Sequence, residues 1–314
     1  QTSDQEWEAV KERAAMENGW FIPAFVALSA NAAATAFLSA EALDKVIAQY
    51  AIPEENKQPK TVGIVMAGNL PMVGFHDLLC GFMSGHIVYI KLSSKDDVLM
   101  RHIIDKLVEW QPQVAEQIHI ADMLKGCEAF IATGSNNSAR YFEQYFAKYP
   151  HIIRKNRTSV AVLDGKETPE ELHALGKDIF SYFGLGCRNV TQVLLPEGYD
   201  ISKIFDALAP YQNIINHHKY NNNFDYHLAI YLLNKVPYMT NDFLLMVENE
   251  MQFSAVSVLH YKYYHNIKEI SALLNDDNIQ CVVGHNHLKF GKSQIPNLND
   301  YADGIDTLAF LQTL

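Results

Sequence analysis

Short apolar runs alternate with helical stretches along this chain, and that alternation restricts its possible folds more than any other feature. The runs TVGIVM, IVYIKL and AFIAT begin at Thr61, Ile87 and Ala129, and a stretch of helical periodicity follows each of them. Strand–helix–strand units of this kind form parallel sheets with helices on their faces. Strands and helices alternate again from Ser159 to Val283, so the sequence predicts an α/β fold with a second α/β domain.

The length of the chain fits two domains. It has 314 residues, and globular domains have roughly 150 residues each. We expect a nucleotide-binding domain over residues 1–157, with helices before its sheet, and a catalytic domain over residues 158–295. The tail, residues 296–314, can return to the first domain.

Charge, cysteine usage and hydropathy bear on partners and compartment. Lys and Arg number 25 against 36 Asp and Glu, and the formal charge of −11 argues against nucleic acid or anionic lipid as a partner. Four scattered cysteines without a C-x-x-C pair favour a reducing cytoplasm. No residue from Trp20 to Ala40 is charged, but polar residues interrupt this stretch, so we expect a packed helix and no membrane insertion. The oligomeric state stays open, and a homo-oligomer is one of the options.

Cys187 is the first candidate for a nucleophile. It follows Gly184 and Gly186 in a turn between a predicted helix and a predicted strand, where small residues let a ligand approach the backbone. The neighbouring Arg188 favours a thiolate, whereas the end of the preceding helix opposes one. A structural cysteine beside a glycine helix cap explains the same pattern.

Loops that follow the first and third predicted strands carry groups suited to an oxyanion or a nucleotide. Asn69 lies between a glycine and a proline and could donate to an oxyanion, although an ordinary turn explains it equally well. Gly134 and Ser135 precede a helix, a position that suits contact with a phosphate or a ribose.

The loop after the second predicted strand carries two ammonium groups and two hydroxyls. Its residues include Lys91, Ser93 and Lys95, at the place where parallel sheets hold the ribose and phosphate of a nucleotide. A solvated helix N-terminus is the alternative interpretation.

Taken in order, these loops and the cysteine resemble the aldehyde dehydrogenase superfamily, whose chain carries an Asn-x-Pro loop, a Lys-x-Ser loop, a Gly-Ser loop and then the cysteine. The turn Gly-x-Gly-Cys-Arg-Asn-Val and the stretch TVGIVMAGNLPMVGFHD are most similar to LuxC-type acyl-CoA reductases, which turn fatty acyl thioesters into aldehydes. The resemblance extends from about residue 15 to the C-terminus. It implies an aldehyde dehydrogenase-like fold with two Rossmann-like parallel-sheet domains.

The resemblance also implies roles for single residues. Cys187 matches the catalytic nucleophile, and Asn69 matches the oxyanion-hole amide. Lys91 and Ser93 match the contacts to the adenosine ribose, and Ser135 matches a serine on the nucleotide side.

Two further segments are compared by the same resemblance. Glu250 begins EMQFSAVSV, which resembles the Glu-Ile-Phe-Gly-Pro segment whose Glu holds the nicotinamide ribose, although other residues replace its Gly and Pro here. Relatives that hydrolyse their acyl-enzyme carry a general-base Glu, and a gapless count from the cysteine places Ile153 of Ile153–Arg157 at that position.

Without that base, the resemblance implies exchange of the acyl-enzyme with a thiol in place of hydrolysis. We therefore predict NAD(P)H-dependent reduction of an acyl-CoA or acyl-carrier thioester to the aldehyde. An acyl-phosphate reductase of the same superfamily, a cysteine hydrolase without a nicotinamide cofactor, and a non-catalytic scaffold are the alternatives.

The loop from Lys91 to Lys95 bears on the choice of cofactor. An acidic side chain there would bind two ribose hydroxyls and favour NAD(H), and the loop has none. Its ammonium and hydroxyl groups can receive a phosphate, so we predict NADP(H) as the preferred cofactor and NAD(H) as the second choice. Asp96 and Asp97 follow directly and could weaken the positive field.

Two histidine pairs raise the question of a metal. They are His217 with His218, and His285 with His287, of which the second would point to one face of a strand. No third ligand stands at a telling spacing, so we expect surface or substrate-side histidines and no metal.

Overall fold

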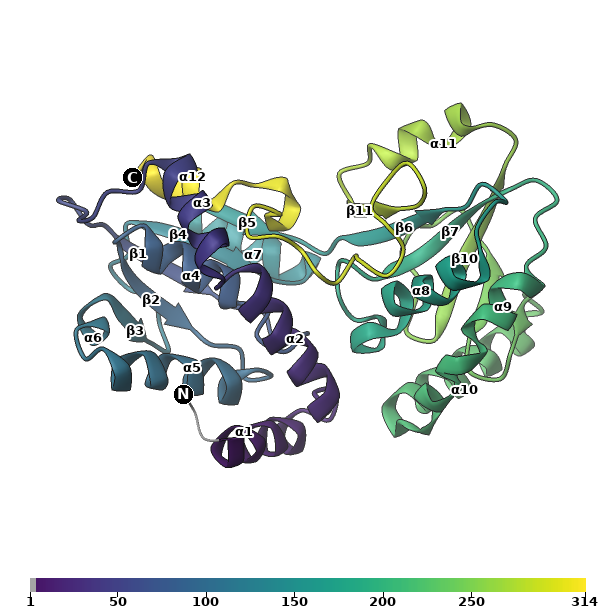
Figure 1. Cartoon of the computed structure of the whole chain (residues 1–314), viewed down its shortest axis with the longest axis horizontal. Coiled ribbons are helices and arrows are strands. Elements are labelled where there is room, and N and C mark those ends of the chain that lie inside the picture. The colour runs from purple at the N-terminus through teal and green to yellow at the C-terminus, as the bar shows by residue number, and fades with distance from the viewer. Residues whose placement is uncertain (1–3) are drawn as a thin grey trace. The chain divides into compact units, whose positions relative to one another are not determined.

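The computed structural model describes residues 4–314, which form two compact units (Figure 1). The first unit runs to Asn156 and resumes from Pro296 to Leu314, so the end of the chain belongs with its beginning. The second unit is Arg157–Ile295. Each unit is built on its own sheet.

The first unit has a five-stranded parallel sheet in the order β3-β2-β1-β4-β5. Its strands are β1 (Thr61–Val65), β2 (Ile87–Lys91), β3 (Ile118–Ile120), β4 (Ala129–Thr133) and β5 (His151–Arg154). Its helices are α1 (Asp4–Glu17), α2 (Pro23–Ala36), α3 (Ala40–Tyr50), α4 (Phe75–Met83), α5 (Asp97–Trp110), α6 (Val114–Gln117), α7 (Asn136–Phe146), α12 (Thr307–Gln312) and the short 3-10 helix η3 (Ala302–Gly304).

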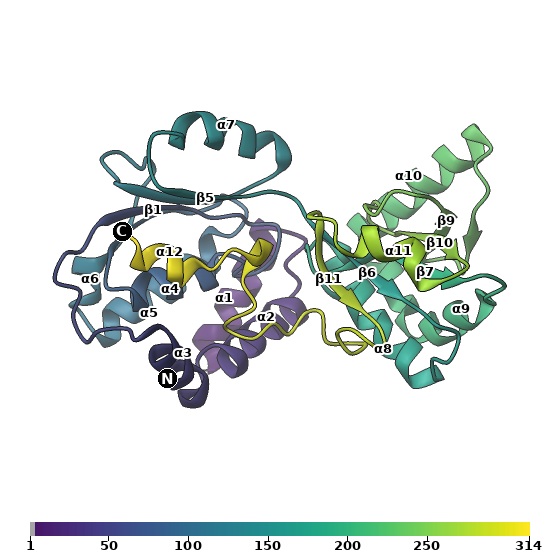
Figure 2. The same cartoon turned by 90° about the horizontal axis from the view of Figure 1, so that it is seen from above.

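Helices cover both faces of this sheet, which explains why its central strands are apolar throughout. Figure 2 shows α7 on one side and α4, α5 and α12 on the other. Ile64 of β1 and Ile131 of β4 are fully buried, and the three middle residues of β1 and the first four of β4 are all buried. The strand order reverses between β1 and β4, and the loops at the carboxyl ends of these strands flank that switch point.

Two helices begin or end differently from the sequence-based expectation. The helix expected after the first strand begins only at Phe75, because Met72 has a left-handed φ of 57° and the preceding residues form turns. The uncharged stretch from Trp20 to Ala40 is not one helix, because α2 ends at Ala36 and Ser39 caps α3 by accepting from the Ala42 N–H at 3.3 Å. Over residues 4–314, no single helix is long and apolar enough to cross a membrane. Taken together α2 and α3 would be, but they are bent by 56°.

The second unit has a six-stranded sheet in the order β11-β6-β7-β10-β9-β8, parallel except for the pair β8 and β9. Its strands are β6 (Thr158–Val162), β7 (Val190–Pro196), β8 (Met239–Thr240), β9 (Leu245–Glu248), β10 (Val258–Tyr264) and β11 (Ile279–Val283). Its helices are α8 (Pro169–Phe180), α9 (Ser202–Leu208), α10 (His218–Asn234), α11 (Ile267–Leu274) and the 3-10 helices η1 (Ser181–Gly184) and η2 (Ala209–Asn216).

Successive residues of β6 pack on opposite faces of this second sheet. Ala161 lies in one hydrophobic cluster with Leu175 of α8, while Val160 lies in another with Ile270 of α11. Burial on both faces fixes the register of β6 and the strands beside it, and thereby the position of the turn that enters β7.

Candidate functional site

Cys187 lies in the turn that connects α8 to the amino end of β7, where the sequence predicted it. After α8 the chain takes three consecutive left-handed residues, with φ of 54° at Tyr182, 57° at Phe183 and 77° at Gly184. Left-handed backbone is unfavourable for the two aromatic residues, so the surrounding structure must hold the turn. Cys187 itself is half-buried and therefore within reach of a reagent.

Asn189 organises this turn, a role that the local sequence does not reveal. Its side chain is fully buried, and its Oδ1 accepts from the Gly186 N–H at 2.8 Å. Its Nδ2 donates to the carbonyls of Asp178, Ile179 and Ser181 at 3.0, 3.2 and 2.9 Å. Carbonyls at the end of a helix carry partial negative charge, which opposes a nearby thiolate. The Asn189 amide engages three of them.

Two strands fix the backbone of Cys187. The Ser159 hydroxyl of β6 donates to the Cys187 carbonyl at 3.0 Å and lies 3.1 Å from the Sγ of Cys281 in β11. Cys281 is half-buried like Cys187, whereas Cys80 and Cys127 are buried. Burial raises the pKa of both buried thiols, and the nearby Asp77 carboxylate raises that of Cys80 further.

Glu250 lies beside a cavity of about 350 Å³ in the second unit. Its carboxylate pairs with the Lys262 ammonium, and its side chain is 79% exposed. The residues that line the cavity are Glu248, Asn249, Glu250, Tyr261 and Lys262.

The chain that follows Glu250 runs along the amino end of β7. The Thr191 hydroxyl donates to the Gln252 carbonyl at 2.5 Å, and the ring of His260 lies 2.8 Å from the Met251 carbonyl through Nδ1. Thr191 stands four positions after Cys187, so the structure brings this segment to the strand end that carries the cysteine turn.

The three predicted loops of the first unit meet at one edge of its sheet. Because β2, β1 and β4 are parallel neighbours, the loops of Lys91, Asn69 and Ser135 all leave from their carboxyl ends. Gly68 packs so closely on the second loop that a Cβ there would lie 2.4 Å from the Ser93 hydroxyl. Only glycine fits at that contact.

The third loop begins α7. The Ser135 hydroxyl accepts from the Ser138 N–H at 3.3 Å and caps the helix, and a Cβ on Gly134 would lie 2.9 Å from the Ser138 Cβ. This loop therefore has the close packing and the helix N-terminus that suit a phosphate or ribose. Capping of the helix by Ser135 explains this residue equally well.

Of the two acids that follow Lys95, the first is buried and the second is paired with an arginine. Asp96 is buried, and that burial raises the pKa of its carboxyl to about 8. Asp97 accepts two hydrogen bonds of 2.9 and 2.7 Å from the Arg101 guanidinium. These hydrogen bonds are the largest effect on the pKa of Asp97, and they lower it. Burial therefore favours the neutral form of Asp96, and the Arg101 guanidinium balances the charge of Asp97. Lys91 and Lys95, which are both exposed, keep a positive loop suited to a phosphate.

The stretch aligned with the hydrolytic base offers no carboxylate. Ile153 and Arg154 lie on β5, and the buried Arg154 guanidinium donates to both carboxylate oxygens of Asp77 at 2.7 and 2.6 Å. It also donates to the Thr307 hydroxyl of α12 at 2.7 Å. The position thus contributes to the internal packing of the first unit, and nothing in it could activate water.

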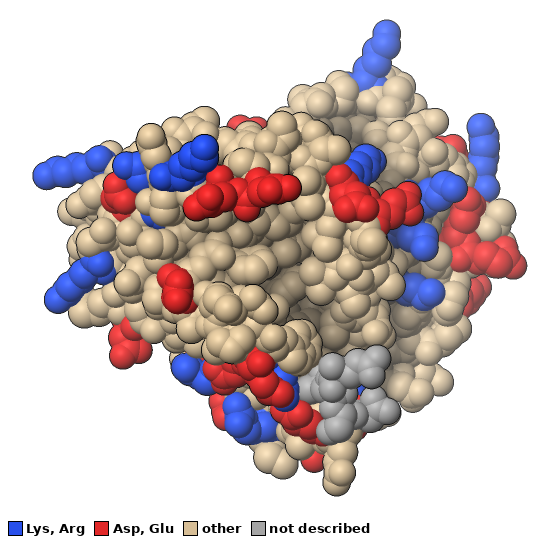
Figure 3. Space-filling model, turned by 60° about the vertical axis from the view of Figure 1, so that its left-hand side comes forward, with Lys and Arg blue, Asp and Glu red and all other residues tan. Residues whose placement is uncertain are grey.

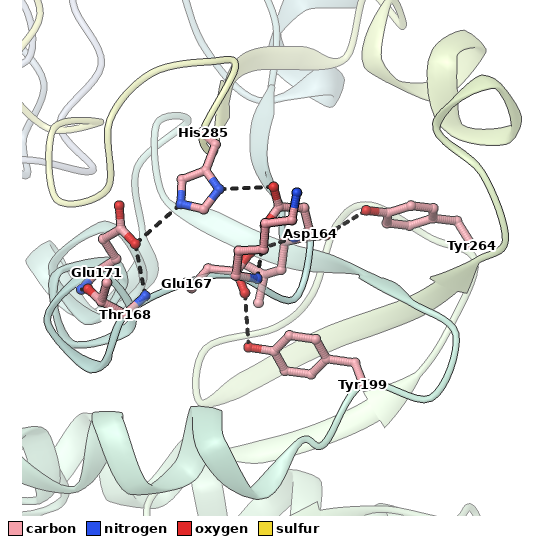
Figure 4. Close-up of polar contacts among 9 residues, drawn as sticks. Asp164, Glu167, Thr168, Glu171, Tyr199, Tyr264 and His285 are labelled. Atoms are coloured by element: carbon pink, nitrogen blue, oxygen red, sulfur yellow. Dashed lines mark hydrogen bonds and ion pairs between the residues drawn. The ribbon is translucent and has the colours of Figure 1, made fainter.

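The two histidine pairs have surroundings that differ from one another. His285 lies in the turn after β11 and not on a strand, and its ring lies between Asp164, 3.0 Å from Nδ1, and Glu171, 3.2 Å from Nε2 (Figure 4). These hydrogen bonds raise the His285 pKa. His217 instead stacks on Phe183, with ring centroids 4.2 Å apart.

A metal-ligand geometry does exist at His285, although the spacing did not reveal it. Among residues 4–314, Asp164, Glu167 and His285 form a group whose possible ligand atoms all lie within 4.8 Å of one another. Glu167 accepts from the Asp164 N–H, and Glu171 belongs to the capping box of α8, so these hydrogen bonds account for the arrangement. We assign no metal to it.

Charges of both signs are mixed on the surface. On the face drawn in Figure 3, Lys and Arg side chains are interspersed with Asp and Glu, and no broad basic patch is seen there. The exclusion of nucleic acid as a partner stays a prediction from the net charge.

Comparison with known proteins identifies the fold. No family model and no curated protein matches the sequence. Among solved structures, the chain is similar to aldehyde dehydrogenase 21 of Physcomitrella patens in complex with succinate, with a TM-score of 0.65 and 11% identity over 89% of this chain and 70% of that one. A putative aldehyde dehydrogenase of Burkholderia cenocepacia gives a TM-score of 0.58 at 14% identity, covering 88% of this chain and 71% of that one.

An aldehyde dehydrogenase of Mycobacterium tuberculosis complexed with NAD+ gives a TM-score of 0.52 at 15% identity over 69% of this chain. The chain spans 54% of the length of that enzyme. The fold is therefore that of the aldehyde dehydrogenases, as the sequence predicted. These identities establish the fold alone, and the finer resemblance to LuxC-type reductases stays a prediction.

Proposed function

We propose that this chain carries the nucleotide-binding and catalytic units of an NAD(P)H-dependent acyl-thioester reductase. The observation that carries the proposal is the Cys187 turn, which a buried Asn189 holds at the strand end expected for a nucleophile. Ile153–Arg157, where hydrolytic relatives carry their base, has Arg154 bound to Asp77. A cysteine without such a base favours transfer over hydrolysis.

The first unit would hold the nucleotide. Lys91, Ser93 and Lys95 supply donors for the adenosine ribose and its phosphate. Ser135 lies at the N-terminus of α7. The paired Asp97 and the buried Asp96 leave the positive charge of the two lysines uncancelled, which supports NADP(H) over NAD(H). A bound dihydronicotinamide supplies the hydride that turns a cysteine thioester into an aldehyde.

The residues of the chain do the rest of the chemistry. The Cys187 thiolate attacks the thioester carbonyl, the bond from the acyl carbon to the carrier sulfur breaks, the carrier leaves as its thiolate and takes a proton from water, and the acyl group stays on the Cys187 sulfur. Asn69 would donate its amide to the oxyanion, the role that the resemblance implies for it. Glu250, beside its cavity, would receive the nicotinamide ribose once it parts from Lys262.

The test is NADPH consumption with a panel of acyl-CoAs and acyl-carrier thioesters, with free thiol measured in parallel. We expect wild type and Cys281→Ala to consume NADPH and release the thiol, and Cys187→Ala to do neither. Cys281 is the matched control because it is the other half-buried cysteine. Turnover of an acyl phosphate alone would favour the acyl-phosphate reductase, and thiol release without NADPH would favour the hydrolase.

A further inference from the structure

Asp96 stands at the N-cap of α5, but its carboxylate does not cap that helix. An aspartate at this position usually accepts from a backbone N–H of its own first turn, and no such bond exists here. The side chain is 3% exposed, and its Oδ2 accepts from the Met72 N–H at 2.7 Å. The carboxylate thus binds a different loop, the one that follows β1.

That loop carries Asn69 and contains a strained residue. Met72 is buried with a φ of 57°, a conformation that a residue with a side chain keeps only when its surroundings hold it. Two contacts flank the turn: the Ser29 hydroxyl donates to the Pro71 carbonyl at 2.7 Å, and Asp96 accepts from the Met72 N–H. The strained residue itself makes two hydrogen bonds: its N–H donates to Asp96, and its carbonyl accepts from the Phe75 N–H at 3.0 Å. Of these, the Asp96 bond is the one that connects the turn to another loop.

The other oxygen of Asp96 has no hydrogen-bond partner among residues 4–314, and no cation pairs with this carboxyl. Burying a carboxyl without a cation or a second donor costs free energy. The hydrogen bond from the Met72 N–H is the interaction that offsets part of this cost. We propose that Asp96 is a positioning residue that fixes the turn carrying Asn69. Its effect on catalysis rests on the proposed function, whereas its effect on the turn does not.

Hydrogen exchange in the full chain tests the turn directly. Asp96→Ser offers a shorter hydroxyl that can cap α5 but is too short to keep the Met72 bond, so the variant should fold. Asp96→Asn keeps an acceptor oxygen at full length. Asp97→Ala is the control, because Asp97 pairs with Arg101 on α5 and touches no part of the turn.

We expect the peptide that contains Met72 to exchange at least about tenfold faster in Asp96→Ser, and close to wild type in Asp96→Asn and Asp97→Ala. Equal exchange in Asp96→Ser and wild type would overturn the inference. So would equal acceleration in Asp97→Ala, because the effect would then come from α5.

Activity supplies an independent readout. If the proposed function holds, Asp96→Ser lowers kcat by about tenfold with KM nearly unchanged, and Asp96→Asn restores it, because only the position of the Asn69 amide has changed. If wild type reduces no thioester, the proposed function fails while the exchange experiment still decides the role of Asp96. A lower kcat without faster exchange would refute positioning.

Discussion

Replacing Asn189 with alanine tests whether this side chain builds the cysteine turn. Asn189 is fully buried. Its Oδ1 accepts from the Gly186 N–H, and the two hydrogens of its Nδ2 are shared among three carbonyls around the end of α8. At about 1 kcal/mol for each of these three donated hydrogens, the loss is about 3 kcal/mol in the free energy of unfolding. That is a large part of the 5–15 kcal/mol typical of a domain.

The assay can separate the two units. All three tryptophans, Trp7, Trp20 and Trp110, lie in the first unit, so tryptophan fluorescence follows that unit while hydrogen exchange in β7 follows the second. A loss of about 3 kcal/mol lowers the protection of β7 amides about a hundredfold, since 1.4 kcal/mol corresponds to a factor of ten. Cys187 should also alkylate faster.

The control is Asn222→Ala on the exposed side of α10, which should change stability by less than about 0.5 kcal/mol. The reasoning is refuted if Asn189→Ala lowers β7 protection by less than tenfold, or if the fluorescence transition of the first unit moves as far as the second unit loses protection.

Three further predictions concern the proposed reaction. Cys187→Ala should abolish thioester reduction and leave nucleotide binding intact, which a calorimetric titration with NADPH checks. In wild type an alkylating reagent should reach Cys187 before the buried Cys80, which mass spectrometry of the labelled protein checks. Asn69→Ala should lower kcat by about 10²–10³ with a modest change in KM, and a defect in KM alone would contradict the oxyanion role. Lys95→Ala should weaken NADPH more than NADH, by about 1–3 kcal/mol, and titration of both nucleotides would show an error if the two weaken equally.

Strands buried on both faces could be predicted from the sequence because burial leaves a continuous apolar signal. The strand expected at Thr61–Met66 is Thr61–Val65, and the one expected at Ala129–Thr133 has those bounds. By contrast, β3 and β9 have three and four residues, too few for a period to show, and their pairing depends on neighbours far along the chain.

The site could be predicted only as far as local sequence reaches. The glycines around Cys187 signal a turn locally, and the turn is there. The role of Asn189 depends on where α8 ends, and that of Asp96 on a loop 24 positions earlier in the chain. The strand predicted to end at Val283 does end there, as β11. The place of the His285 ring between two carboxylates could not be predicted, because Asp164 and Glu171 lie 121 and 114 positions earlier in the chain.

The carboxyl of Asp96 should also make the stability of the first unit depend on pH. Burial, the largest effect, raises its pKa to about 8, the Met72 hydrogen bond opposes that shift, and the charge of Asp97 adds to it. In the unfolded chain the pKa of an aspartate is about 3.9. The native state therefore binds this proton more tightly. The stabilisation is fully present below about pH 4 and is lost as the pH rises towards about 8, by about 1.4 kcal/mol for each pH unit.

Urea unfolding followed by tryptophan fluorescence at pH 5, 6, 7 and 8 measures this contribution as the difference between wild type and Asp96→Asn, which cannot ionise. Groups that titrate in both proteins cancel in the difference, so its slope belongs to Asp96. The matched variant is Asp97→Asn. The Arg101 hydrogen bond lowers the pKa of the Asp97 carboxyl, which is therefore ionised throughout this range, and its charge is the smallest cause of the raised Asp96 pKa, so the difference from wild type should be nearly flat. A flat difference for Asp96→Asn as well would mean that Asp96 is ionised in the native protein. A negative charge would then lie beside Lys91 and Lys95, and the argument for a preference for NADP(H) would fail.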